Sequence, residues 1–290
     1  SRAIVNTLVV LAVSARCLAA VAAEERAAAT ALSQARQVLK QGDRAQAKAL
    51  FLDVCRKYPN TRQAPAALLS HAHLVLPTDP ALAETEFRTV ATSYPVSPEA
   101  PRAWLRVAYL RLKTNEADAP IYLRIVADQY PGTVAAQEAL FRLGRLSIRD
   151  KDYEKAAEIL EAAEQVPGSD WTKSQALVHT GEAHMFTFLA TRDRAELDKA
   201  AAILLHVEDK YPKQPRSIMQ GRVDIARLYA FVGQAADHGR RPRSTMLLAA
   251  TRSLRWTAKL WCTYATILTP TISPRCMSRL KTLRCSPRTW

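Results

Sequence analysis

The sequence predicts an all-α fold, a right-handed superhelical solenoid of stacked helix-turn-helix repeats. A Tyr-Pro dipeptide recurs every 36 residues, and small and bulky apolar residues recur at fixed distances from it. A unit of this length holds two helices that bury their apolar faces only against neighbouring units, so the repeats share one continuous core. The composition, 48% apolar and 23% charged, is ordinary for a folded chain and excludes collagen, low-complexity disorder and disulfide-dense miniproteins.

The prolines mark the end of each unit. Tyr58-Pro59, Tyr94-Pro95 and Tyr130-Pro131 stand 36 residues apart, a further 36 residues lead to Val166-Pro167, and 45 more lead to Tyr211-Pro212. Proline ends the preceding helix because it lacks an amide proton and crowds the turn before it. Five units are therefore expected, and a sixth has only a first helix, over residues 217–231.

The second helix of each unit is predicted from apolar residues that precede the proline. They stand five, eight and twelve residues before it: Val54, Val90, Val126 and Val207; Phe51, Phe87, Leu123 and Leu204; Ala47, Ala83, Ala119 and Ala200. Residues at these spacings share one helical face. The small alanine lets a neighbouring helix approach closely, and the larger residue fills the space beside it.

The first helix is predicted from a second register that follows each proline. Its small and bulky residues stand eight, nine and thirteen residues later: Ala67, Ala103 and Ala139; Leu68, Trp104 and Leu140; Ala72, Ala108 and Gly144. Each helix is expected to have about four turns. In the fifth unit, Gly181 lies 19 residues before Ala200, an excess of seven over the fourth unit, which predicts a longer first helix through Phe188 or a longer turn.

The turns between helices have suitable chemistry. Asp79-Pro80 supplies an N-cap carboxylate followed by proline at the first helical position. Gly42-Asp43 and the run from Asp150 to Asp152 each offer a helix stop followed by a cap.

The pattern resembles the tetratricopeptide repeat over about residues 25–233. The fourth unit carries the matching residues Leu140, Leu143-Gly144, Ala156, Leu160, Ala163 and Pro167. The resemblance implies that the first helices line a concave groove that holds a segment of a protein partner. Carried over by register, the groove positions are His73, Arg102, Tyr109, Phe141, Arg145, Glu182 and Arg227. The arginines are expected to pair with carboxylates and the two aromatic residues to act as anchors. No asparagine stands where chaperone-binding members carry their carboxylate clamp.

No catalytic or metal-binding motif is present. The sequence has no HExxH, Gly-rich phosphate loop, GxSxG or CxxC pattern. His71 and His73 are two residues apart and would point about 200° away from each other on a helix, so they are expected to pack rather than share a metal. The chain is therefore expected not to be an enzyme and to use no cofactor, metal or small-molecule substrate.

The chain ends differ from the repeat array, which is placed at residues 23–233. Residues 1–22 have a positive start, a short apolar stretch and a small-x-small pattern, the layout of a secretory signal peptide. Cys17 suggests a lipid anchor, although Arg16 departs from the small residue expected before a lipidated cysteine.

Residues 234–290 form the basic tail. No acidic residue follows Asp237, whereas 11 Lys and Arg do, so the net charge of +14 belongs mostly to the tail. Three interpretations stay open: a poorly ordered tail, a frame-shifted translation product, or a basic arm for anionic partners. Nucleic-acid binding by the main body receives no support from this charge and is disfavoured.

The predicted function is a non-catalytic protein–protein interaction scaffold in the bacterial cell envelope. A repeat array behind a secretory signal resembles the lipoprotein of outer-membrane β-barrel assembly and the periplasmic partner of the Tol–Pal system. The expected location is the periplasm or the periplasmic face of the outer membrane. The alternative is an accessory subunit of a polysaccharide-export or peptidoglycan-processing complex.

Overall fold

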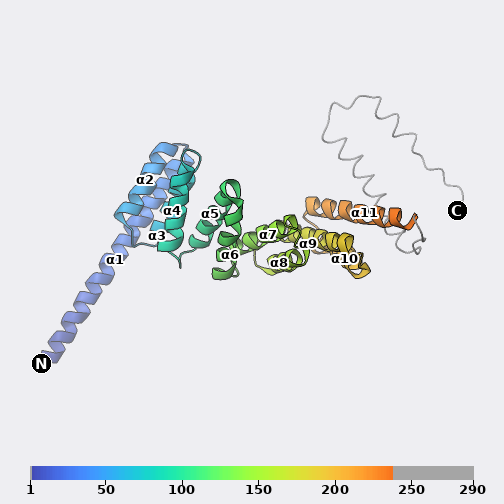
Figure 1. Cartoon of the computed structure of the whole chain (residues 1–290). Helices are drawn as coiled ribbons and strands as arrows, with labels where there is room; N and C mark the ends of the chain where they lie inside the picture. The colour runs from blue at the N-terminus through green and yellow to red at the C-terminus, as the bar shows by residue number, and fades with distance from the viewer. Residues whose placement is uncertain (1, 238–290) are drawn as a thin grey trace. The chain divides into compact units, whose positions relative to one another are not determined.

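The computed structural model describes residues 2–237, which are helical apart from short turns, with no strand among them (Figure 1). The helices are α1 (Arg2–Lys40), α2 (Arg44–Lys57), α3 (Gln63–Val75), α4 (Pro80–Ser93), α5 (Ala100–Thr114), α6 (Ala119–Gln129), α7 (Val134–Arg149), α8 (Tyr153–Gln165), α9 (Asp170–Thr191), α10 (Arg194–Lys210) and α11 (Pro215–Asp237), with a 3₁₀ turn (Glu116–Asp118) before α6. The predicted all-α repeat fold is confirmed.

The described residues divide into two compact units, one on each side of the boundary between Thr180 and Gly181, and each unit is described by itself. In the first unit, every helix from α1 to α7 packs on the next helix in sequence, and α1 contacts α3 while α5 contacts α7. In the second unit, α10 packs on α11. Odd-numbered helices are the first helices of the predicted repeats and even-numbered helices are the second.

The core consists of the residues that define the repeat. The bulky residue eight positions before each proline is at most 3% exposed in every unit: Phe51, Phe87, Leu123 and Leu204, with Leu160 filling the corresponding place in α8. The alanines four residues earlier are fully buried. The predicted second-helix faces are therefore the faces that pack.

Two first-helix glycines set the closest approach within a hairpin. A Cβ atom on Gly144 would lie 2.4 Å from the Cγ of Leu160, and one on Gly181 would lie 2.5 Å from the Cγ of Leu204. Two non-bonded carbon atoms do not approach each other this closely, so a side chain at either position would clash with the leucine. The small position of the repeat is thus required because the leucine of the second helix occupies the space where a side chain would begin.

The caps differ in how they form. Asp43 and Asp79 each accept a hydrogen bond from the amide three residues later, at 2.9 Å, as the sequence predicts. Gly42 has a φ of +95°, a conformation that favours glycine. Asp152 stands at the N-cap of α8 but makes no side-chain cap bond, so that part of the prediction is wrong; the left-handed Lys151 makes the turn there instead.

The Tyr-Pro dipeptides also connect neighbouring units. The hydroxyl of Tyr94 donates a hydrogen bond to the carbonyl oxygen of Pro59 at 2.8 Å, one repeat earlier. Tyr58, Tyr94, Tyr130 and Tyr211 are all C-caps whose amides bond to the carbonyl four residues before. The tyrosine therefore ends its own helix and, at Tyr94, bonds to the preceding repeat.

The fifth repeat resolves an alternative left open by the sequence. Helix α9 has 22 residues and reaches Thr191, and only two residues separate it from α10. The seven extra residues lengthen the first helix rather than the turn. The predicted sixth first helix is present as α11.

The predicted signal peptide corresponds to the N-terminal part of helix α1. Helix α1 runs unbroken through the predicted end of the signal at residue 22, and its N-terminal part extends beyond α2 (Figure 1). The side chain of Cys17 and most of the basic tail lie outside the described residues. None of the described helices combines the length and hydropathy that crossing a bilayer requires.

Candidate protein-binding surface

Within each compact unit, neighbouring first helices meet at polar and aromatic side chains, which we call the first-helix seam. It consists of His73, Arg102 and Arg106 between α3 and α5; Tyr109, Glu138 and Arg142 between α5 and α7; Phe141, Arg145 and His179 between α7 and α9; and Glu182 and Asp224 between α9 and α11. All seven predicted groove residues except Arg227 belong to the seam, and Arg227 bonds to it.

His73 is a packing residue. It is half-buried, its Nδ1 donates to the carbonyl oxygen of Leu69 at 2.8 Å, and its ring meets the edge of Phe87 at 5.1 Å. Burial lowers the pKa of His73, and the nearby positive charges of Arg106 and Arg102 lower it further, although the Leu69 bond opposes them. His73 is therefore neutral at pH 7, and Arg102 and Arg106 beside it are exposed.

Tyr109 ties α5 to α7. Its hydroxyl donates to Oε1 of Glu138 at 2.7 Å, and Nε of Arg142 donates to the same oxygen at 3.1 Å. The Arg142 guanidinium lies 5.3 Å from the centre of the Tyr109 ring. Burial, followed by the bond to Glu138, raises the pKa of Tyr109, so the phenol stays protonated. Its role in the structure is to bond two repeats.

Phe141 contradicts its prediction as an exposed anchor. Its side chain is 2% exposed and packs in a core with Leu160 and Ala176. The rings of Trp171 and His179 lie 6.3 and 5.6 Å away, measured between centroids. The next first helix covers the ring, and no partner can reach it without displacing α9.

Arg145 stays on the surface above this core. It is exposed, and its guanidinium lies 5.8 Å from the centre of the Phe141 ring. The neighbouring Trp171 is 45% exposed. The accessible groups at this step are therefore a cation and an indole, rather than the predicted phenylalanine.

In the second unit the seam is a carboxyl pair. Asp224 is fully buried and accepts hydrogen bonds from Nε2 of Gln220 at 2.9 Å and from Nη1 of Arg227 at 3.0 Å. It also hydrogen-bonds with Glu182. Burial raises the pKa of Asp224 to about 6, and the charge of Glu182 raises it as well. Glu182 and Arg227 thus both interact with a buried aspartate that the sequence reasoning missed. The Arg227 guanidinium, predicted to pair with a carboxylate of a partner, pairs with Asp224 of its own helix.

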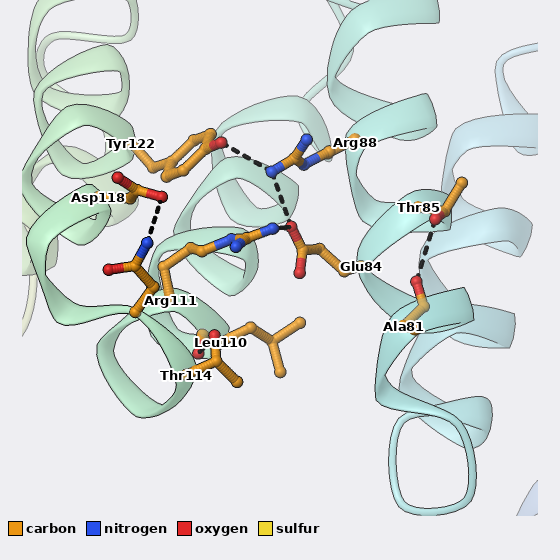
Figure 2. A network of polar contacts seen from close by, with 10 residues as sticks. Ala81, Glu84, Thr85, Arg88, Leu110, Arg111, Thr114, Asp118 and Tyr122 are labelled. Carbon is orange, nitrogen blue, oxygen red and sulfur yellow. Dashed lines mark hydrogen bonds and ion pairs between the residues drawn. The ribbon is translucent and has the colours of Figure 1, made fainter.

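A second polar network joins the hairpins away from the seam (Figure 2). Glu84 of α4 pairs with Arg88 at 2.7 Å and with the guanidinium of Arg111 on α5. Nη2 of Arg88 donates to the hydroxyl of Tyr122 on α6 at 2.7 Å. These contacts neutralise Arg111, which leaves fewer cations of α5 available to a partner.

Three exposed arginines of the seam remain for a partner. Within residues 2–237, Arg102, Arg106 and Arg145 have no carboxylate partner. The sequence analysis identified two of them and missed Arg106, which could have been found because it lies one helical turn after Arg102. The seam therefore separates into buried contacts between repeats and an exposed cationic part.

Two kinds of reactive group can be assessed among the described residues, a metal-holding cluster and a cysteine thiol. No three His, Cys, Asp or Glu side chains among them are grouped closely enough to hold a metal ion. Burial raises the pKa of Cys55 to about 12, so its thiol is protonated at pH 7 and unreactive as a nucleophile.

Tyr109→Phe is expected to lower the free energy of unfolding by about 1 kcal/mol, because a half-buried hydrogen bond is lost while Glu138 keeps Arg142. Urea unfolding followed by circular dichroism measures the change. The matched control is Tyr94→Phe, which removes the exposed hydroxyl bonded to Pro59 and is expected to cost less. An equal or larger loss from the control would contradict the role of Tyr109 in joining the repeats.

Comparison with known proteins agrees with the helical hairpins. A family model for the tetratricopeptide repeat matches residues 15–61 and 138–169. Among proteins of curated function, none matches the sequence significantly.

Three solved structures are similar to this chain at 15 to 17% sequence identity. A tetratricopeptide repeat protein from Parabacteroides merdae is 15% identical, covers 76% of this chain and 83% of its own, and has a TM-score of 0.49. MamA protein is 17% identical, covers 64% of this chain and 94% of its own, and has a TM-score of 0.46. Pseudomonas aeruginosa pilF is 16% identical, covers 69% of this chain and 99% of its own, and has a TM-score of 0.36.

The two matched segments correspond to two of the hairpins described above. Residues 15–61 contain the end of α1 together with α2, and residues 138–169 contain most of α7 together with α8. The match to α7 and α8 includes Gly144 and Leu160, the pair in closest approach. The family model therefore matches two of the hairpins that the 36-residue repeat predicts.

Proposed function

We propose that this chain is a non-catalytic protein-binding scaffold of the bacterial cell envelope, and that its first-helix face receives a segment of a partner protein. The observation that carries the proposal is the set of exposed arginines, Arg102, Arg106 and Arg145, on consecutive first helices without carboxylate partners in the described chain. Repeats of this kind suggest protein–protein interaction, since stacked first helices present one continuous surface.

The envelope location is supported by the N-terminal pattern alone. Residues 1–22 read as a secretory signal, and the resemblance to the barrel-assembly lipoprotein and the Tol–Pal partner follows from that reading. The family match begins at residue 15, inside this segment. Fractionation of cells that produce the full chain tests the location: recovery with periplasmic or outer-membrane proteins is expected, and recovery with cytoplasmic proteins would contradict it.

The scaffold function is tested by co-purification from envelope extract with the wild-type chain and an Arg102→Ala/Arg145→Ala variant. The variant is expected to recover markedly less partner. The matched control is Arg56→Ala/Arg124→Ala, which removes two exposed cations of the second helices α2 and α6. Unchanged recovery by the first variant, or equal loss in the control, would overturn the first-helix face as the binding surface.

The identity of the recovered proteins separates the proposed function from its alternative. Barrel-assembly or Tol–Pal components would support the proposed envelope role. Polysaccharide synthases or peptidoglycan hydrolases would support an accessory subunit of an export or peptidoglycan-processing complex instead.

A further inference from the structure

Charge is segregated between the first and second helices of the third and fourth repeats. The first helices α5 and α7 contain seven Lys and Arg and a single Glu, whereas the second helices α6 and α8 contain two Lys and Arg and five Asp and Glu. The neighbouring first helix α3 has no Asp, Glu, Lys or Arg. The positive charge of these two repeats is therefore concentrated on their first helices.

The contacts of the described residues account for only part of this charge. Arg111 pairs with Glu84, Arg142 with Glu138, and Arg149 with Asp150. Arg102, Arg106 and Arg145 are exposed and have no carboxylate partner within residues 2–237.

Arg102 and Arg106 lie four residues apart on α5, and both face His73. Like charges at this spacing weaken an isolated helix slightly, so the pair does not serve helix stability. His73 donates Nδ1–H to a backbone carbonyl and is kept neutral by burial, so it does not neutralise them. The two guanidinium groups are left with ten N–H donors and only solvent to accept them.

We infer that the α5–α7 face binds an acidic segment of the partner protein, with Arg102 and Arg106 sharing its carboxylates and Arg145 binding a further one. This inference rests on the proposed function and names the chemistry of the partner. The forked guanidinium group forms paired hydrogen bonds to carboxylates. Because the three side chains are exposed, binding should weaken as salt increases.

A protein segment fits this face better than a nucleic acid does. Single-stranded nucleic acids gain much of their affinity from bases stacked on aromatic side chains. The ring of Tyr109 is covered by the Arg142 guanidinium, and Phe141 is 2% exposed. Neither of these two aromatic residues is therefore open to a base, and Trp171 beside Arg145 supplies a single exposed indole rather than a series of stacking surfaces.

The inference is tested on the full chain with three photoreactive twelve-residue peptides of equal length. The first is rich in Asp and Glu, the second carries Asn and Gln at those positions, and the third carries Lys. Binding is measured by fluorescence anisotropy, and the cross-linked residues are identified by mass spectrometry. A single-stranded twelve-nucleotide RNA is the fourth probe, because the basic tail and the α5–α7 face both carry cations that phosphate could bind.

The acidic peptide is expected to bind most tightly and to cross-link to α5 and α7. Arg102→Ala/Arg106→Ala is expected to weaken its binding by about tenfold, because two charge-assisted contacts are lost. The control Arg56→Ala/Arg124→Ala should leave its affinity unchanged. Circular dichroism of each variant shows whether the fold is retained.

The remaining outcomes distinguish failure of the acidic-partner inference from failure of the scaffold function. Equal binding of the neutral peptide at the same face would overturn the acidic partner while leaving the scaffold function standing. Cross-linking of the acidic peptide only to residues 238–290, or tighter binding of RNA to the same arginines, would overturn the inference. No loss of affinity in the double variant would also overturn it.

Discussion

Replacing Gly144 with alanine is expected to destabilise the first unit by about 2 kcal/mol, because the added methyl group would lie 2.4 Å from the Cγ of Leu160. Helix propensity alone would change the stability in the opposite direction, because alanine is favoured over glycine in a helix by about 1 kcal/mol. A measured loss therefore reports the packing of α7 against α8 and not helix propensity. Urea unfolding followed by far-ultraviolet circular dichroism measures it.

A double-mutant cycle with Leu160→Ala isolates the contact. Leu160→Ala alone is expected to cost about 2 to 5 kcal/mol, because it leaves a cavity at a fully buried site. In that background the methyl group of Gly144→Ala has room, and the second substitution should become neutral or stabilising. A Gly144→Ala penalty that persists unchanged without the Leu160 side chain would contradict the close approach of the two helices.

The second unit is expected to become more stable as the pH falls from about 6 to about 4, by about 2 to 3 kcal/mol from Asp224. Burial and the charge of Glu182 raise the pKa of Asp224 from 3.8 to about 6 in the folded chain. The folded state therefore binds a proton that the unfolded state has already released in this range. Stability must fall as the pH rises through it, and stay lower above it.

The measurement compares the wild-type chain with Asp224→Asn from pH 4 to pH 8. Asparagine keeps the shape of the protonated acid and cannot ionise, so the variant is expected to be the more stable at pH 7 and to gain nothing from Asp224 on acidification. Subtracting the two curves removes opposing groups such as Glu196, whose pKa is lowered chiefly by Lys199 and His184. A difference between the curves that does not vary with pH would contradict the burial of an ionisable aspartate.

The repeat fold was predictable because its signal is redundant. The Tyr-Pro spacing, the alanines and the bulky residues such as Phe87 each indicate the same helical hairpin, and the buried faces follow from them. The extra length of α9 was predictable only as one of two alternatives. Whether the extra residues lengthen the helix or the turn depends on where the chain turns. The turn begins at Arg192, whose backbone is in the left-handed conformation, and nothing in the sequence marks this residue for that conformation.

The binding surface was less predictable because equivalent positions of a repeat meet different neighbours. Phe141 occupies a groove position by register, but Trp171 and His179 of the next first helix cover it. Arg227 meets a buried aspartate three residues earlier on its own helix. Register predicts which face of a helix a residue occupies, whereas exposure depends on the side chains that the adjacent helix supplies.

The central claim is that the partner lies on the first-helix face of α5 and α7. It is tested most directly by placing the photoreactive residue p-benzoylphenylalanine at Arg106 of α5 and, as the control, at Arg124 of α6. After irradiation in envelope extract, Arg106 is expected to yield a cross-link to an Asp- and Glu-rich segment of a partner protein, and Arg124 none. A cross-link from Arg124 to that same segment, with none from Arg106, would contradict the account.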